Sequence, residues 1–427
     1  MQVLPSKFLN TLIGVGLLLG LASNVCLAAD EANEPTGALK LQDALNLAMR
    51  GNPEIAVTLR EREAVQSMQA QAIVRPNPTV SASIQDTRSS LRQTILQINQ
   101  EIELGDKRAV RIEAADAYLS RADAALDSKK ADIHANVVTN FYAALVAQER
   151  VNLAKSSLEI ANLGLDAAAK RVRAGKSAPV EETKSKIAEA GAKIAVMQAE
   201  SQLVNAKQQL SALWGNALPV FTLAEGRVTV IPEIGNLKAL SMRLDTAPSI
   251  KLAMLEINTR AAITKIEQSK KTQNITISAG VDNNQELGGR NQALLGFSVP
   301  IPVFDRNQGG IQEAIVRQYK AQDELTALKN QLAASLANQY ARYVSGKQAA
   351  ESLAAEILPG AQSAFEVANK GFSAGKFGFL DVLDAQRTLS QTKSQYIDAL
   401  QETHQAVAEI ERILGDVVSH PNDKSQE

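Results

Sequence analysis

The amino-acid sequence predicts a mainly α-helical fold with a shared β-barrel, built from duplicated long antiparallel helical hairpins and four β-strands per chain. Three observations predict this fold: motifs that recur at a nearly constant offset, very long heptad-patterned stretches, and four segments with period-two alternation. Composition agrees, because 45% of the residues are apolar but only 4% are aromatic, which favours closely packed helices. The formal net charge of −1 gives no electrostatic reason to expect nucleic-acid binding.

The first 28 residues have the pattern of a secretory signal peptide. Lys7 precedes the apolar run LNTLIGVGLLLGLASNV, and small residues at Cys26 and Ala28 predict cleavage after Ala28. Lipoprotein processing at Cys26 is the alternative, but the preceding SNV does not match a lipobox. Cleavage after Ala28 leaves a mature chain without cysteine, and therefore without disulfides or thiolate metal ligands.

Repeated motifs indicate that the rest of the chain is a duplication. NPEI at 52–55 matches APSI at 247–250, an offset of 195, and AGK at 174–176 matches AGK at 374–376, an offset of 200. LWG at 213–215 matches ILG at 413–415, again at 200. The predicted units are a first repeat over 29–215, a linker over 216–236, a second repeat over 237–415 and a polar tail over 416–427.

Each repeat begins with helical stretches, about 40–74 and 237–271, that are interrupted at Asn52-Pro53 and Ala247-Pro248. Alternating segments follow, and they predict strands at about 78–86, 91–103, 273–282 and 291–301. Segments of about ten residues fit transmembrane β-strands, although a soluble hairpin in each repeat is the simpler alternative. Because the smallest membrane barrels have about eight strands, several chains would have to share one barrel. Strand counting leaves a dimer, a trimer and a tetramer open.

The longest predicted elements are helices at about 106–174, 178–214, 308–373 and 378–414. Between residues 106 and 178 there is no proline. Apolar residues there recur at spacings of three and four from Ile133 to Val172, with Asn140 the only polar member, which is a sustained heptad seam. A helix over 109–174 would be about 100 Å long at 1.5 Å per residue. Alanine-rich seams let antiparallel helices of this length pack closely as a wall.

Sequence motifs for catalysis are missing. The three histidines, His134, His404 and His420, are far apart in the sequence, and no Walker loop, nucleophile elbow, HExxH or dinucleotide fingerprint occurs. We therefore expect neither an enzyme nor a bound cofactor.

The signal peptide, the duplicated layout and the opening pattern L-x-x-A-L-x-x-A-x-x-x-N-P from Leu41 to Pro53 together resemble the TolC-like outer-membrane factor family. This resemblance implies a homotrimer with a twelve-stranded barrel in the lipid of the outer membrane and a helical tunnel in the periplasm of a Gram-negative cell. The stretch QEIELGDKRAVRIEAADA at 100–117 resembles the cobalt-zinc-cadmium resistance branch. That branch implies a three-component pump, with a periplasmic membrane-fusion adaptor and an inner-membrane resistance-nodulation-division transporter.

The resemblance also assigns candidate site residues. The turns at Gly175-Lys176 and Gly375-Lys376 would dock the adaptor, and Asp381 and Asp384 match aspartates that ring the pore. Residues i and i+3 share a helix face, so three chains would form two stacked rings of carboxylates. The alternative is that both acids stabilise the N-terminus of a helix.

Four further residues are candidate gate neighbours. Glu181 and Glu182 match the second acidic pair in the first repeat, but as adjacent residues they do not share one face equally. Phe372 and Phe377 occupy places where the family's archetype has a tyrosine and an arginine that hold the tip shut. A charged latch of that kind is therefore not expected here.

The function implied is passive export of divalent heavy-metal cations through the outer membrane. A duct for drugs or secreted polypeptides is the alternative in the same class. A periplasmic coiled-coil structural or adaptor protein without a barrel is the alternative from a different class, and the alternating segments argue against it.

Overall fold

The computed structural model describes residues 34–86 and 88–415 of the 427-residue chain. The predicted signal peptide at 1–28 and the polar tail at 416–427 lie outside the described residues. Among the described helices, none is both long and apolar enough to cross a lipid bilayer.

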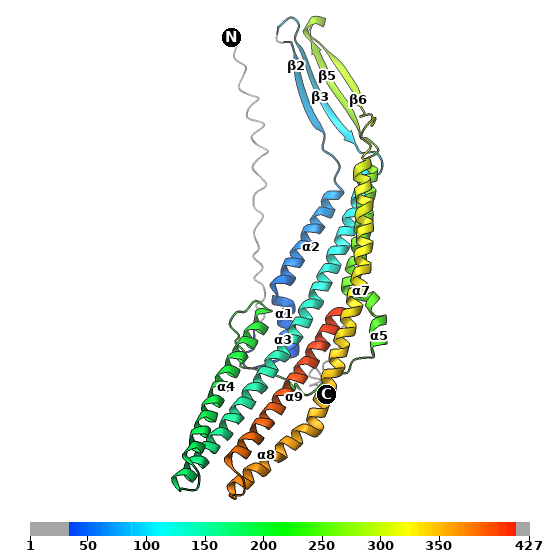
Figure 1. The fold of residues 1–427 in the computed structure, drawn as a ribbon. Coiled ribbons are helices and arrows are strands. Elements are labelled where there is room, and N and C mark those ends of the chain that lie inside the picture. The colour runs from blue at the N-terminus through cyan, green and yellow to red at the C-terminus, as the bar shows by residue number, and fades with distance from the viewer. Residues whose placement is uncertain (1–33, 87, 416–427) are drawn as a thin grey trace, which may run out of the picture. The chain divides into compact units, whose positions relative to one another are not determined.

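The same order of elements occurs twice in the described chain. Each time, short helices lead to a pair of strands, and a helical stretch then runs to a turn from which a second long helix returns. Figure 1 shows the four-stranded sheet at one end of the long helices and the two helix-to-helix turns at the other. The helices are α1 (Leu41–Gly51), α2 (Pro53–Ala72), α3 (Lys107–Arg173), α4 (Pro179–Ala212), α5 (Leu237–Met242), α6 (Pro248–Ser269), α7 (Gln308–Ser352), α8 (Leu358–Ser373) and α9 (Phe379–Leu414). The strands are β1 (Ala38–Lys40), β2 (Thr79–Gln85), β3 (Gln93–Ile102), β4 (Leu223–Glu225), β5 (Ile275–Asn284) and β6 (Arg290–Ser298).

The break between α1 and α2 follows from Asn52-Pro53. The Asn52 carboxamide oxygen accepts hydrogen bonds from the backbone N–H groups of Glu54 (2.8 Å) and Ile55 (3.1 Å), which caps α2. Pro53 occupies the first turn of α2, where its missing N–H costs nothing. The Asn52 side chain also donates to the Leu213 carbonyl at 2.7 Å, so this cap ties the start of the first repeat to the end of α4.

The sheet has strand order β2-β3-β5-β6, and each neighbouring pair is antiparallel. One face is apolar, as in the row formed by Val80, Ile98, Ala279 and Leu295, of which three are more than half exposed. The other face is polar: Asn99 donates to the Ser81 hydroxyl (3.1 Å) and accepts from Ser278 (2.7 Å). The outer edges of β2 and β6 are left without a strand partner in this sheet.

A parallel pair of short strands, β1 with β4, joins the start of the chain to the linker between the repeats. Next to it, the Glu34 carboxylate accepts hydrogen bonds from the Trp214 and Asn216 side chains and from the backbone N–H groups of Val220 and Phe221. Burial raises the pKa of Glu34, but these four hydrogen bonds outweigh it and lower the pKa overall. Residues 216–236, expected only as a linker, therefore also hold the start of the chain through Val220 and Phe221.

The helix expected over 308–373 is instead divided. α7 ends at Ser352, a π-helical segment covers Leu353–Ile357, and α8 begins at Leu358. Pro359 explains the break, because its ring lacks an N–H and would clash with the carbonyl four residues earlier in a regular α-helix. Figure 1 shows α8 continuing from α7 at an angle, whereas α3 is drawn without such a break.

Candidate functional site: the two helix turns

The two helix-to-helix turns have the same backbone geometry. Gly175 and Gly375 both have positive φ, +68° and +76°, which is the left-handed conformation that glycine adopts readily. In each turn the next residue, an exposed lysine, closes a Schellman motif at the end of the helix. The closing bonds are Lys176 N–H to the Arg171 carbonyl (2.9 Å) and Lys376 N–H to the Gly371 carbonyl (2.8 Å).

The acids of the second turn are both exposed, but they differ in their contacts. The Asp381 carboxylate accepts a hydrogen bond from the backbone N–H of Gly378 at 2.8 Å, which caps the start of α9. Asp384 lies one turn further along α9. The helix-capping interpretation therefore applies to Asp381, while the spacing of three keeps both carboxylates on one side of α9.

The acids of the first turn lie in a different setting. Glu182 forms an ion pair with Lys186 one turn later, with 2.7 Å between the charged atoms. Glu181 is half-buried in the first turn of α4. The negative charge of Glu182 is therefore balanced within its own helix.

Phe372 lies in a small apolar cluster at the end of α8 and is only 6% exposed. Its buried neighbours include Ala368 and, from α9, Val382. The Arg171 guanidinium of α3 lies 4.7 Å from the centroid of the Phe372 ring and donates to the Phe372 carbonyl at 3.3 Å. Arg171 thus links the two hairpins close to their turns.

Phe377 packs on its own hairpin. A Cβ atom built at Gly371 would lie 2.0 Å from a ring carbon of Phe377, so the ring rests directly on the glycine backbone. In the first repeat, the position that matches Gly371 at the offset of 200 is Arg171. Sequence reasoning missed Arg171; the replacement of a glycine by a charged residue between the repeats is the signal that would have found it.

A groove of about 790 Å³ lies between the two hairpins beside the turns. Its lining combines apolar side chains, including Phe365 and Phe372, with the three cationic side chains of Lys170, Arg171 and Lys176. The turns therefore offer a partner a mixed apolar and basic surface.

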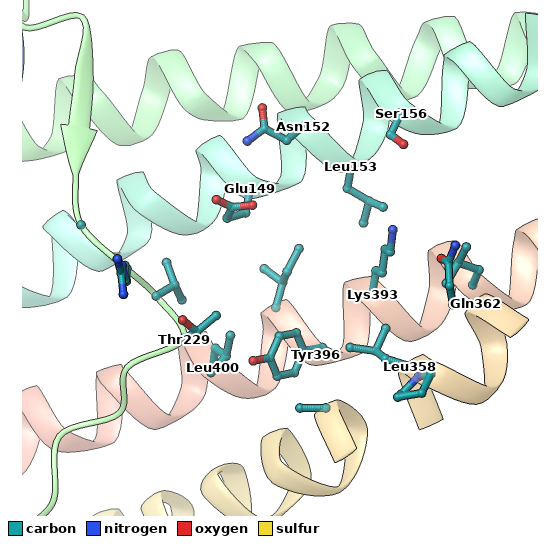
Figure 2. A pocket seen from close by; sticks show the side chains of 17 residues that line it. Glu149, Asn152, Leu153, Ser156, Thr229, Leu358, Gln362, Lys393, Tyr396 and Leu400 are labelled. Carbon is teal, nitrogen blue, oxygen red and sulfur yellow. The ribbon is translucent and has the colours of Figure 1, made fainter. Parts of the chain in front are cut away.

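A second cavity, of about 690 Å³, lies at the level of the π-helical segment. Figure 2 shows Glu149 and Leu153 of α3 on one side of it and Lys393 and Tyr396 of α9 on the other. Leu358, at the start of α8, completes this part of the lining. The hairpins are thus joined near the turns by the Arg171–Phe372 contact, and at the level of the cavity by an ion pair between Arg150 and Asp398 (2.7 Å) and a hydrogen bond between Ser157 and Ser390 (3.1 Å).

Within the described residues, no three histidine, cysteine, aspartate or glutamate side chains come close enough to hold a metal ion.

Comparisons with known proteins cover nearly the whole described chain. The sequence model of the family described as "Outer membrane efflux protein" matches residues 44–216 and 239–416. The chain is 40% identical over 382 residues to the cobalt-zinc-cadmium resistance protein CzcC of Cupriavidus metallidurans, covering 90% of this chain and 91% of that protein. It is 27% identical to the nickel-cobalt-cadmium resistance protein NccC of Alcaligenes xylosoxydans, covering 77% and 74%. The solved outer-membrane channel OprN superposes with a TM-score of 0.73 at 19% identity, over 90% of this chain and 91% of that one.

Proposed function

The chain belongs to the outer membrane efflux protein family, and we propose that it is the exit duct of a three-component pump that expels divalent heavy-metal cations. The observation that carries the metal assignment is the match to a cobalt-zinc-cadmium resistance protein over nine-tenths of both chains. A second relative named for nickel, cobalt and cadmium resistance supports the same cargo class. The duct performs no chemistry on its cargo.

We propose that three copies assemble into one barrel of twelve strands. The open edges of β2 and β6 support this, because each can be satisfied only by a strand from another copy. β2 and β6 run in opposite directions, so pairing between neighbouring copies would continue the antiparallel sheet. The apolar face, with Val80, Ile98 and Leu295, would contact outer-membrane lipid, and the polar face with Asn99 would line the lumen.

In this assembly the helix turns form the periplasmic end of the tunnel. We propose that Gly175, Lys176, Gly375 and Lys376 contact a periplasmic membrane-fusion adaptor, which joins the duct to an inner-membrane resistance-nodulation-division transporter. The exposed lysines and the groove beside the turns support a docking role for this end.

The same assembly would bring three copies of α9 together around the pore. We propose that Asp381 and Asp384 form two rings that attract cations, with Phe372 and Phe377 packed behind them and Glu181 and Glu182 on the neighbouring hairpin. Each Asp384 carboxylate is exposed, which suits a field that acts through water.

Metal tolerance of a deletion strain tests the proposed cargo. Loss of the gene should lower tolerance to cobalt, zinc, cadmium or nickel, and the wild-type gene should restore it. A strain with unchanged metal tolerance but reduced tolerance to organic drugs would overturn the metal assignment and favour a drug duct.

Conductance of the purified protein in planar bilayers tests the acidic rings. The double variant Asp381→Asn with Asp384→Asn should weaken the block caused by multivalent cations added on the periplasmic side. The matched control is Glu181→Gln with Glu182→Gln in the first turn, which should leave the block nearly unchanged. Equal block in the wild type and the Asp381/Asp384 variant would mean that these acids do not line the constriction.

A further inference from the structure

The cavity beside the π-helical segment has the size of a ligand-binding pocket. Its volume of about 690 Å³ lies within the range of roughly 300–1,000 Å³ that small-molecule sites occupy. It follows α9 from Leu389 to Leu400, eleven residues or about 16 Å of helix. α3, α8 and the linker between the repeats contribute the rest of its lining. We call this cavity the π-segment pocket.

The floor of the π-segment pocket is apolar. Leu389, Ile397 and Leu400 of α9 line it and are only 4%, 9% and 2% exposed. Figure 2 shows Leu153 of α3 and Leu358 of α8 on opposite sides of the pocket. Because three helices contribute these side chains, the apolar surface is concave and suits the apolar body of a small ligand.

Lys393 brings a positive charge into this apolar surrounding. Its side chain is half-buried, and Figure 2 shows its amino group directed across the pocket toward Leu153. Within residues 34–86 and 88–415, no carboxylate lies at ion-pair distance from Lys393. A partly desolvated ammonium group without a counter-ion is unfavourable, and a bound anion would relieve that cost.

Tyr396 adds a hydrogen-bond donor one turn along the same helix. Figure 2 shows its hydroxyl directed toward Thr229 of the linker. Burial raises the pKa of Tyr396 above its usual value, so the phenol keeps its proton at neutral pH and can donate to an oxygen atom. The pocket thus combines an apolar floor with a few polar groups, which is the composition of ligand sites.

The charges of the lining favour an anion. Arg227 and Lys393 are the cations of the lining, and Glu149 is its one carboxylate. Glu149 is exposed, so water screens its charge, whereas the half-buried Lys393 is screened less. A divalent cation would therefore be repelled more strongly by Lys393 than it is attracted by Glu149.

We propose that the π-segment pocket binds a small amphipathic carboxylate of the fatty-acid type. The carboxylate contacts the Lys393 amino group, and the chain lies over Leu389 and Ile397. The ligand touches α3 of the first hairpin together with α8 and α9 of the second, so it bridges the two hairpins at the π-helical segment. This inference goes beyond the proposed function, because the ligand has the opposite charge to the proposed cargo.

Photolabelling of the full-length protein in outer membranes tests this site. The probe is decanoate with a diazirine near the end of its chain, and mass spectrometry identifies the labelled peptides. Labels should concentrate in residues 149–156, 358–362 and 389–400, and excess decanoate should remove them. Decyltrimethylammonium, which has a similar chain and the opposite charge, should compete about tenfold less well. Labelling of the strands reports partition into lipid and serves as the internal standard.

Variants at the pocket separate charge from apolar contact. Lys393→Gln should lower labelling of the pocket about tenfold, because a hydrogen bond to a charged group is lost, and Lys393→Arg should retain most of it. The matched control is Lys155→Gln, since Lys155 lies on α3 at the same level but pairs with Glu200 of α4 at 2.9 Å. Ser156→Phe starts from an exposed position of the lining and should fill the pocket and block labelling.

Three results would overturn the site. The first is equal labelling in the wild type and Lys393→Gln, and the second is equal competition by decanoate and decyltrimethylammonium. The third is labelling of the strands without labelling of the pocket, which would mean that a neighbouring copy or the tail of the chain fills it. None of these results bears on the proposed duct, which the metal tolerance of a deletion strain tests separately.

Discussion

At the first helix turn Gly175 follows α3 and has Arg171 and Ser177 beside it, whereas at the second turn Gly375 follows α8 and has Gly371 and Phe377. The two turns share three backbone hydrogen bonds at the glycine, and the second turn adds one from the Phe377 N–H to the Gly371 carbonyl (3.3 Å). The side chains differ: the first turn is polar, and the second is packed around Phe372 and Phe377. The two turns thus share one backbone frame but differ in their side-chain contacts.

The helices that lead into the turns differ in the same way. α3 is a single helix of 67 residues, whereas the matching stretch of the second repeat is divided by the π-helical segment before Pro359. A divided helix gives the second hairpin a place to bend. Its end is held against α3 by Arg171 and the cluster around Phe372. The second hairpin therefore depends on the first, and this dependence can be tested by paired substitutions.

The largest expected effect is that of Phe372→Ala. Removing a buried aromatic side chain costs about 3 kcal/mol or more, so local opening of α8 near the turn should become more than a hundredfold more frequent. Hydrogen exchange of the purified protein measures this at residues 361–373. The equivalent change in the first turn, Val172→Ala, removes a smaller and half-buried side chain and should have a much smaller effect. Equal effects would mean that the two turns are stabilised alike.

Substitution of the turn glycines should affect both hairpins equally. Gly175→Ala and Gly375→Ala each place a Cβ atom in open space, so the cost is the left-handed backbone alone, about 1–2 kcal/mol. Hydrogen exchange across each turn should therefore rise by similar factors. A clearly larger effect at Gly375 would show that the second turn is strained by its side-chain contacts.

Removal of the α9 cap should again affect the two hairpins differently. Asp381→Ala eliminates the hydrogen bond from the Gly378 N–H and should cost about 1 kcal/mol, seen as faster exchange in the first turn of α9. Glu181→Ala is the equivalent change by offset and should alter exchange in α4 less. If Asp384→Ala destabilised α9 as much as Asp381→Ala, the capping role of Asp381 would be wrong.

The smallest expected effect is that of Arg171→Gln, about 0.5–1 kcal/mol, because the guanidinium is half-exposed above the Phe372 ring. A double-mutant cycle with Phe372→Leu isolates the contact between the two hairpins. We expect a measurable coupling free energy for Arg171 with Phe372. A coupling of zero would mean that the contact between the guanidinium and the ring does not stabilise the hairpin ends.

Much of the fold follows from local sequence signals. Period-two alternation identifies strands and heptad spacing identifies helices, because apolar side chains recur with the period at which each element presents its buried face. The interruption at Asn52-Pro53 is predictable for the same reason, since the cap and the proline act on adjacent residues. The break before Pro359 was missed, because the helix expected over 308–373 was continued through this proline to the glycine turn.

The contacts between the hairpins were beyond sequence reasoning. Arg171 and Phe372 are 201 residues apart, and neither has a motif that specifies the other. The same holds for Glu34 and its partners near Trp214, since a carboxylate surrounded by donors is recognisable only once the chain has brought them together. The glycine turn before them identified the acidic pair Asp381 and Asp384. Only the folded structure shows that Asp381 accepts a hydrogen bond from the Gly378 N–H.

The pairing of β3 with β5 determines the order in which the strands can assemble. β3 pairs with β5 through residues such as Leu96 and Val281, which belong to different repeats. Pairing across so long a loop is slow and has to wait until the second repeat has been exported. Until then the hairpin of the first repeat has two open edges and an apolar face in the periplasm, which are the conditions for aggregation. A chain that ends before β5 would therefore lack the partner of β3, and its first strand pair would keep two open edges.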